Sequence, residues 1–345
     1  MRLLIIMQTV DRKDSAMGFY HGWIAELAKH FEFITIFALK IGEHALPENV
    51  TVIPLRPWGY RARLRTALRV LFLTWKHRRT YDVVFVHMNQ EYSLVAGWLF
   101  KLLGKRVYMW RNHYAGNILT DISALFCDKI FYTSKSSYTA RYKNARQMPV
   151  GVDVGSCHLD EPIVRVPQSI LFLGRFDVSK RPDLVVEALG KIARRSISFT
   201  ATFVGGPSDL ASTFPKEVEA RARELDIADR VTFVGPVANT DTYRSYRSHA
   251  IYVNCGKSGM LDKSLFKSIA CGCLPVFTSA DMAEIIGSEF AYTDGDIDDL
   301  AKHLESALAL SETERSARVS EFQAKAIDAH TLPVLAGRLA HEMSL

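Results

Sequence analysis

Cysteine is scarce in this chain: five cysteines occur among 345 residues, and no two of them form a Cys-x-x-Cys pair. An odd number of dispersed cysteines indicates neither a disulfide framework nor a zinc site, so the sequence favours a reducing compartment such as the cytoplasm. Cys271 and Cys273 flank a glycine in an apolar run, and we expect both to fill a hydrophobic core.

Long apolar runs are also missing. A membrane-spanning helix needs about 18 consecutive apolar residues or more, and the sequence contains no such run. The apolar residues 3–7 near the N-terminus are too few for the core of a secretion signal, and they predict a buried strand instead.

Acidic residues are fewer than basic ones, 37 against 43, which gives a formal net charge of +6. This balance favours acidic partners, namely nucleotide phosphates, nucleic acid or an anionic membrane, without choosing among them. A chain that is 48% hydrophobic and 23% charged is globular. Its length favours two domains over one.

Short apolar runs alternate with amphipathic stretches, which predicts an α/β protein built from β-α-β units and parallel sheets. The expected strands cover 3–7, 33–38, 51–54, 83–87, 106–110, 129–133, 169–173, 200–204, 230–234, 251–254 and 274–277. The expected helices cover 20–31, 90–103, 182–194, 215–225, 241–248, 263–271 and 298–310, with a mostly helical end over 313–345. The segment 149–168 holds three prolines and two glycines and interrupts the alternation, so it predicts the linker between two Rossmann-like domains.

A glycine and two cations follow the first expected strand of the second half. Gly174 ends the strand, Arg175 comes next, and Lys180 precedes a proline that suits the first turn of a helix. A strand end beside a helix N-terminus is a common place for phosphate groups. Arg175 could hold two diphosphate oxygens, Lys180 could add a mobile charge, and Gly174 could let the ligand approach the backbone. Two solvated cations in a loop would give the same spacing.

A second polar loop follows the expected strand 251–254. Asp262 is placed to cap a helix over 263–271, whose free amides could bind the other side of a phosphate. Lys257 and Lys263 would add positive charge. An ordinary β-loop-α unit explains the apolar pattern equally well, but it does not explain two lysines and two glycines in one loop.

These segments resemble the C-terminal half of retaining glycosyltransferases of family 4, which have the GT-B fold, two Rossmann-like domains with parallel sheets facing an interdomain cleft. The resemblance covers roughly residues 169–290. It rests on Gly174-Arg175 with Lys180, Val204-Gly205-Gly206, Phe233-Val234-Gly235, and Ile269-Ala270-Cys271-Gly272 before Pro275-Val276. The N-terminal half varies more in that family, and the comparable positions here are Met17-Gly18-Phe19-Tyr20-His21, His113 and Gly151-Val152-Asp153.

The resemblance implies an acceptor-binding domain over 1–160, on which the last helix, 325–345, packs back, and a donor-binding domain over 169–324. It implies a hexosyltransferase-type enzyme that uses a nucleotide diphosphate sugar and requires no metal or other cofactor. Arg175 and Lys180 would stabilise the leaving diphosphate, and His113 would hydrogen-bond the donor sugar, although a structural histidine is the alternative there. The other implied donor contacts are Gly174, Gly205, Gly235, Gly259, Asp262, Lys263, Lys267 and Glu284, and the acceptor side would include Gly18 and His21.

Two carboxylates of that family are missing from this sequence. The family usually has a Glu-x7-Glu pair, and the aligned positions here are Gly259 and Lys267. A lysine cannot accept hydrogen bonds from ribose hydroxyls as a glutamate can. Asp262 could replace the sugar contact and Glu284 the ribose contact. The departure leaves the donor undetermined, and it leaves open a loss of activity.

Acidic residues are absent from the segment 56–79, which contains eight arginines or lysines. Leu64, Leu68, Leu71, Phe72 and Trp75 lie at helical spacing within it, as in basic amphipathic helices that bind anionic membranes. The expected membrane-facing residues are Arg61, Arg65, Arg69 and Trp75. A helix that packs this apolar stripe on its own sheet and solvates the basic face explains the pattern equally well.

The leading hypothesis is a retaining glycosyltransferase that builds cell-surface polysaccharide on a glycan or lipid-linked acceptor. It would work in the cytoplasm, peripherally on the inner face of the plasma membrane. The alternative is a non-catalytic nucleotide-sugar-binding or scaffold protein on the same fold. Nucleic acid is not an expected partner, because no nucleic-acid motif is present and the basic residues concentrate in one helix.

Overall fold

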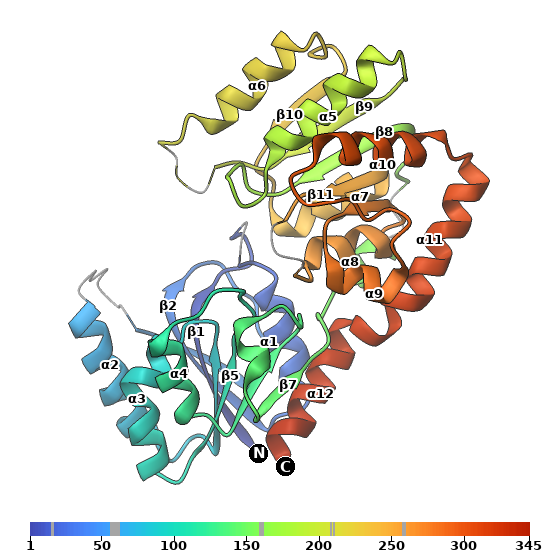
Figure 1. Cartoon of the computed structure of the whole chain (residues 1–345). Coiled ribbons are helices and arrows are strands. Elements are labelled where there is room, and N and C mark those ends of the chain that lie inside the picture. Colours follow the sequence, from blue (N-terminus) through green and yellow to red (C-terminus); the bar gives the residue numbers. More distant parts are fainter. Residues whose placement is uncertain (15–16, 56–62, 159–161, 208, 210, 257–259) are drawn as a thin grey trace. The chain divides into compact units, whose positions relative to one another are not determined.

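The computed structural model describes residues 1–345 except 15–16, 56–62, 159–161, 208, 210 and 257–259 (Figure 1). The chain divides into two compact units, one made of Met1–Gly151 with Leu332–Leu345 and the other of Val152–Thr331. The boundary between them lies near the start of the proline-containing segment 149–168. Each unit is a parallel sheet with helices packed on it, as the alternating sequence pattern predicts.

Seven parallel strands form the sheet of the first unit, in the order β3-β2-β1-β4-β5-β6-β7. The strands are β1 (Arg2–Val10), β2 (Phe33–Ile41), β3 (Val50–Pro54), β4 (Val83–His87), β5 (Arg106–Trp110), β6 (Lys129–Tyr132) and β7 (Ala145–Gln147). The helices are α1 (Tyr20–Ala28), α2 (Arg63–Lys76), α3 (Glu91–Leu102), α4 (Ile118–Leu125) and α12 (Leu332–Ser344), with a 3₁₀ turn at Tyr138–Arg141.

Both faces of this first sheet are covered. Successive residues of a strand point to opposite faces, so Leu3 and Ile5 pack with α1 and α12 in one apolar cluster. Leu4 and Ile6 pack with α2, α3 and α4 in a second cluster on the other face. The C-terminal helix α12 is fixed further by the Tyr108 hydroxyl, which donates a 3.1 Å hydrogen bond to the Met343 carbonyl.

Five parallel strands form the sheet of the second unit, in the order β10-β9-β8-β11-β12. They are β8 (Val166–Leu173), β9 (Thr200–Val204), β10 (Val231–Gly235), β11 (His249–Asn254) and β12 (Leu274–Phe277). The helices are α5 (Pro182–Arg194), α6 (Phe214–Glu224), α7 (Thr242–Ser248), α8 (Lys263–Ala270), α9 (Ala280–Ile286), α10 (Ile297–Ala309) and α11 (Glu312–Ala326). Short 3₁₀ turns lie at Gly155–His158, Asn239–Asp241 and Asp328–His330.

The expectation of unpaired cysteines is wrong for two of the five. Cys271 forms a disulfide with Cys157, which lies 114 residues earlier in the chain. Spacing rules miss this pair because only packing of the 3₁₀ turn Gly155–His158 against the end of α8 brings the two Cα atoms to 4.8 Å. Cys273 is buried with a free thiol, as a core residue is expected to be.

The orientation of α2 also contradicts one of the two interpretations of its sequence, namely that its apolar stripe packs on its own sheet. Leu64, Leu68, Phe72 and Trp75 are exposed, with exposed fractions between 51% for Trp75 and 72% for Leu64. The side of α2 that packs on the sheet carries instead Thr66, Val70, Leu73 and Thr74. Leu71 is the one residue of the predicted stripe that packs, partly buried, with the core on this face of the sheet. The interpretation that the whole stripe packs on the sheet is therefore wrong, and the membrane interpretation of this helix is the one still open.

Candidate functional site

Glycine backbone lies at the carboxyl ends of β8, β9 and β10 in the second unit. The Gly174 amide donates to the Val204 carbonyl over 3.0 Å, and the Gly205 amide donates to the Gly235 carbonyl over 2.9 Å. Gly205 has a φ of +140°, and a Cβ at this position would lie 1.8 Å from the Gly174 carbonyl oxygen. A Cβ at Gly174 would make only ordinary contacts, the nearest at 3.6 Å. Packing within the protein therefore requires glycine at 205 but not at 174.

Asp177 organises the loop that carries the two predicted cations. Its Oδ1 accepts the backbone amides of Ser179 at 2.9 Å and Lys180 at 3.2 Å. Its Oδ2 lies 3.4 Å from Nε of Arg175, whose Nη2 also donates to the Ser179 hydroxyl at 3.2 Å. Arg181 ends the loop in the left-handed region at a φ of +49°, and Pro182 then starts α5. The loop conformation is thus set by one carboxylate that the sequence analysis did not single out.

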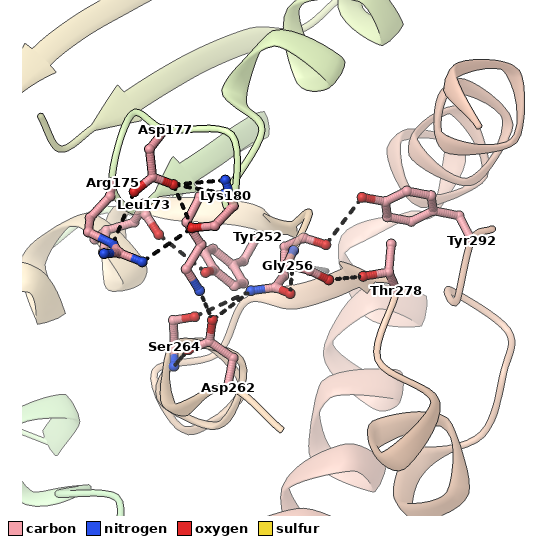
Figure 2. A network of polar contacts seen from close by, with 12 residues as sticks. Leu173, Arg175, Asp177, Lys180, Tyr252, Gly256, Asp262, Ser264, Thr278 and Tyr292 are labelled. Atoms are coloured by element: carbon pink, nitrogen blue, oxygen red, sulfur yellow. Dashed lines mark hydrogen bonds and ion pairs between the residues drawn. The ribbon is translucent and has the colours of Figure 1, made fainter. Parts of the chain in front are cut away.

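Lys180 and Asp262 form an ion pair between the loop after β8 and the N-terminus of α8 (Figure 2). Asp262 caps α8, as predicted, by accepting the Ser264 amide on Oδ1 at 3.1 Å. The Asn254 side chain donates to the other carboxylate oxygen at 3.3 Å. In Figure 2 the charged ends of Arg175 and Lys180 both extend toward the side on which Asp262 lies. The structure therefore brings both predicted cations and the predicted cap to one edge of the sheet.

The ion pair determines the charge of Asp262. Burial alone would raise the pKa of its carboxyl group, but the Lys180 ammonium and the hydrogen bonds from Lys180 and Ser264 outweigh burial. The pKa of Asp262 therefore lies well below its usual range, and the carboxylate is ionised at neutral pH.

Stability near acidic pH is expected to depend on Asp262. Because its pKa is lower in the folded than in the unfolded chain, where it is about 3.9, its ionisation stabilises the fold above about pH 4 and loses this effect as the pH falls further. We expect Asp262→Asn to lower the melting temperature near neutral pH, and the difference from wild type to shrink below about pH 4. Thermal denaturation followed by circular dichroism over a pH series measures this. A difference that stays constant or grows on acidification would contradict it.

Backbone and hydroxyl contacts hold the start of the loop after β11. The Gly256 amide donates to the Asn254 side chain at 3.3 Å, and the Thr278 hydroxyl donates to the Gly256 carbonyl at 2.7 Å. The Tyr292 hydroxyl donates to the Asn254 carbonyl at 3.3 Å, and Tyr252 donates likewise to Leu173 (Figure 2). Asn254 thus joins β11 to both Asp262 and Gly256. It ends a buried strand with an amide, which is the sequence signal that could have identified it.

The remaining predicted donor residues of α8 have distinct positions. Burial lowers the pKa of the Lys263 ammonium well below its usual value, although the Asp262 charge opposes this. Lys267 donates to the Thr242 hydroxyl at 2.7 Å and to the Asn239 carbonyl at 3.3 Å, so its ammonium is directed to the start of α7. Glu284 is exposed on α9. Gly259 and Lys257 lie outside the described residues.

His113 lies in the exposed loop after β5 of the first unit. Its Nδ1 lies 3.0 Å from the Ala115 amide nitrogen and 3.1 Å from the Ala115 carbonyl oxygen, so this ring nitrogen accepts from the amide or donates to the carbonyl according to the tautomer. The preceding Arg111 donates to the Gln90 side chain at 2.9 Å and to the Ala115 carbonyl at 3.0 Å, which fixes the loop. A hydrogen bond from His113 to the donor sugar stays a prediction.

Gly18 and His21 lie where the chain enters α1. The Gly18 amide donates to the Asp14 carbonyl at 2.9 Å, and a Cβ there would lie 2.6 Å from that oxygen. Nε2 of His21 accepts the Ala45 amide at 3.1 Å. Burial lowers the pKa of His21, so its ring is neutral at neutral pH with a donor on Nδ1.

Residues 167–309 match the family model described as "Glycosyl transferases group 1". Two curated relatives are D-inositol 3-phosphate glycosyltransferases. The protein from Acidothermus cellulolyticus is 30% identical over 131 residues, which cover 37% of this chain and 28% of the relative. The protein from Gordonia bronchialis is 32% identical over 174 residues, which cover 45% of this chain and 36% of the relative. The matched part is thus about a third of the length of these relatives.

Solved structures resemble the chain over its whole length. Anabaena HepE in complex with UDP has a TM-score of 0.79 at 14% identity and covers 100% of both chains. Sucrose-phosphate synthase from Thermosynechococcus elongatus has a TM-score of 0.77 at 16% identity and covers 100% of this chain and 99% of its own. WaaG, a glycosyltransferase involved in lipopolysaccharide biosynthesis, has a TM-score of 0.72 at 13% identity with 99% of both chains covered. The chain has the GT-B fold, which confirms the predicted fold class.

Proposed function

We propose that this protein is a glycosyltransferase that takes its sugar from a nucleotide diphosphate sugar. The observation that carries the proposal is the pairing of Lys180 with the capping residue of α8, which puts two cations and a helix N-terminus at one sheet edge. This edge lies within the segment that matches the group 1 family model. The UDP bound to HepE, a protein of the same fold, adds support for a nucleotide ligand.

The proposed reaction retains the configuration of the sugar, as in family 4. The acceptor oxygen forms its bond to the anomeric carbon on the face from which the diphosphate leaves. The carbon–oxygen bond to the diphosphate breaks, and the acceptor proton passes to a diphosphate oxygen. Arg175 and Lys180 stabilise the negative charge that develops on the leaving group. In other enzymes that act on phosphates, a metal ion supplies this positive charge. In the proposed reaction the two side chains supply it, so no metal and no cofactor are required.

The domains have separate roles in this proposal. The second unit binds the donor through Gly174, Gly205, Gly235 and the start of α8. The first unit binds a glycan or lipid-linked acceptor near Gly18 and His21, and His113 forms a hydrogen bond with the donor sugar.

Polysaccharide synthesis at the cell surface is the proposed setting, with the protein bound peripherally to the cytoplasmic face of the plasma membrane. In the described part of the chain, no helix combines the length and the apolar composition needed to cross a bilayer. Peripheral binding would keep a lipid-linked acceptor close to the enzyme.

A second candidate is a nucleotide-sugar-binding protein without turnover. It is favoured by the missing glutamates, and in particular by the position of Lys267. Its ammonium binds Thr242 and Asn239, where the family has a carboxylate for the nucleotide ribose. Such a protein would bind the donor through the same cations but would not transfer its sugar.

Nucleotide binding is the first expected result. We expect UDP, GDP, ADP or CMP to raise the melting temperature, because a ligand that binds only the folded chain stabilises it. The best nucleotide is then tested by calorimetry, and sugars activated with that nucleotide are tested for hydrolysis and transfer. Binding with no turnover of any donor would favour the second candidate. No binding of any nucleotide would contradict both.

A further inference from the structure

Three consecutive helices of the first unit carry half of the large apolar side chains that are exposed in the described part of the chain. They are α2, α3 and α4. Six of these side chains define what we call the apolar surface: Leu68, Phe72, Trp75, Trp98, Leu102 and Leu125. The exposed fraction is 73% at Leu102 and 80% at Leu125. Apolar side chains gathered in this way mark an interaction site more often than chance exposure does.

Within α2, large apolar side chains lie on the exposed side as well as on the packed side. Leu68, Phe72 and Trp75 follow one another at intervals of four and three residues, so they line one side of the helix. That side is exposed, while the packed side buries Thr66, Val70, Leu73 and Thr74. Leu68, Phe72 and Trp75 therefore do not contribute to the core, and burial would stabilise them only in contact with another body.

The three helices present one surface rather than three. They pack with Leu4, Ile6 and other residues on the same face of the seven-stranded sheet. Along that face α2 packs against α3, and α3 packs against α4 (Figure 1). Their outward sides are therefore neighbours.

The charges beside the α2 part of the apolar surface are positive, whereas α3 and α4 carry Glu91 and Asp121 in their first turns. Residues 63–79 contain six arginines or lysines and no acidic residue. The guanidinium carbon of Arg78 lies 4.4 Å from the centre of the Trp75 ring. The Arg69 guanidinium carbon and the Lys76 ammonium lie 5.9 Å and 6.0 Å from the centre of the Phe72 ring. Cations thus accompany the exposed aromatic rings at short range. Protein partners bury few lysines, whereas anionic lipids present negative headgroups just above an apolar interior.

We propose that the apolar surface docks on an anionic phospholipid bilayer. Phe72, Trp75 and Leu102 enter the boundary between headgroups and acyl chains, and the cations of α2 bind the phosphate groups. The proposal identifies the residues of α3 and α4 as parts of the membrane site together with α2. It deepens the membrane part of the proposed function, but it does not depend on sugar transfer.

Vesicle co-sedimentation tests the surface with two paired variants and a matched control. The probes are vesicles of phosphatidylcholine mixed with phosphatidylglycerol, and vesicles of phosphatidylcholine alone. We expect wild type to prefer the anionic vesicles. Leu68→Ser with Phe72→Ser, and separately Leu102→Ser with Leu125→Ser, should each weaken binding at least about tenfold, because apolar burial is lost. The control, Val164→Ser with Val334→Ser, removes two exposed valines elsewhere and should bind as wild type does.

Tryptophan fluorescence locates the contact. In the described residues, Trp75 and Trp98 are 51% and 50% exposed, while Trp23 and Trp110 are buried. We expect anionic vesicles to shift the emission to the blue, and Trp75→Phe and Trp98→Phe each to reduce the shift. Lipids brominated in the acyl chains should quench both residues.

Two results would overturn the proposal. One is vesicle binding that neither paired variant weakens, in protein shown by circular dichroism to be folded. The other is a wild-type dimer in sedimentation that Leu68→Ser with Phe72→Ser dissociates, with no vesicle binding, because the surface would then join two copies of the chain. The nucleotide-induced shift in melting temperature is measured on every variant. Its loss would count against the proposed function, and its persistence without vesicle binding would count against the membrane site alone.

Discussion

Replacing Lys180 with alanine is expected to lower kcat/KM for sugar transfer by about 100-fold, or roughly 2.7 kcal/mol of transition-state stabilisation. The variant loses a cation at the diphosphate, and it also leaves the Asp262 carboxylate without its ion pair. A negative charge would then remain where the leaving group develops its own. Arg175→Ala should cost at least about tenfold, because the more exposed guanidinium already interacts with Asp177.

The matched control for this effect is Lys191→Ala. Lys191 lies on α5 in the same unit, and its ammonium pairs with Asp298 on α10. The control removes a lysine and an ion pair but no charge at the candidate site, so transfer should be unchanged. Steady-state kinetics with the donor found in the nucleotide screen provide the comparison. Equal rates for Lys180→Ala, Arg175→Ala and the control would refute the assignment of the diphosphate site.

Gly205→Ala is expected to destabilise the second unit by more than about 3 kcal/mol, because backbone strain of roughly 1–3 kcal/mol adds to a direct clash. The new Cβ would lie 1.8 Å from the Gly174 carbonyl oxygen, and backbone cannot move aside as a side chain can. The displaced strand end is the one that leads into Arg175. We therefore expect a lower urea midpoint and a weaker nucleotide-induced shift in melting temperature.

Gly104→Ala separates the destabilisation caused by a clash from the destabilisation caused by a left-handed backbone conformation. Gly104 also has a positive φ, +66°, but a Cβ there would meet nothing within 4 Å. Its cost should be limited to the strain of the left-handed region, about 1–2 kcal/mol. If the two alanine variants have the same stability, close approach of the backbone at Gly205 is not what requires glycine there.

Most of the fold could be predicted from the sequence because its strands are short, continuous apolar runs. The strands Val83–His87, Arg106–Trp110, Thr200–Val204 and Leu274–Phe277 begin and end where the pattern predicts. The helix Ile118–Leu125 was missed because it is short and exposes Ile118 and Leu125 rather than burying them. Its start has a recognisable signal, since Asn117 and Thr120 form a reciprocal cap.

The sequence predicts those residues of the candidate site that directly follow a strand or start a helix. It does not predict the residues whose part in the site comes from their hydrogen bonds. Arg175, Lys180 and Asp262 each follow a strand or start a helix, so position in the sequence predicts their place at the sheet edge. Asp177 acts through hydrogen bonds within its own loop, and Asn254 acts through a hydrogen bond to Asp262 at the start of α8. Sequence spacing encodes neither the conformation of the first loop nor the packing that brings Asn254 to Asp262. The roles of these residues in binding and transfer remain predictions.

The side of α2 that contacts its own unit was also beyond sequence analysis. Helical spacing identifies the apolar stripe, but the packed side is set by Val70 and Leu73 against Tyr81 and neighbouring residues. Helical periodicity shows that the stripe and the set with Val70 and Leu73 lie on different sides of the helix. It does not give which set faces the sheet when both contain apolar residues.

The disulfide between Cys157 and Cys271 has a mechanical consequence. The two cysteines enclose the chain from the start of the second sheet to the end of α8, which includes Gly174, Lys180 and Asp262. A stretching force applied to the two termini would be transmitted through the sulfur–sulfur bond and would bypass that enclosed stretch. While the bond is intact, the enclosed residues would add no length to a chain extended by an optical trap, and reduction would release them.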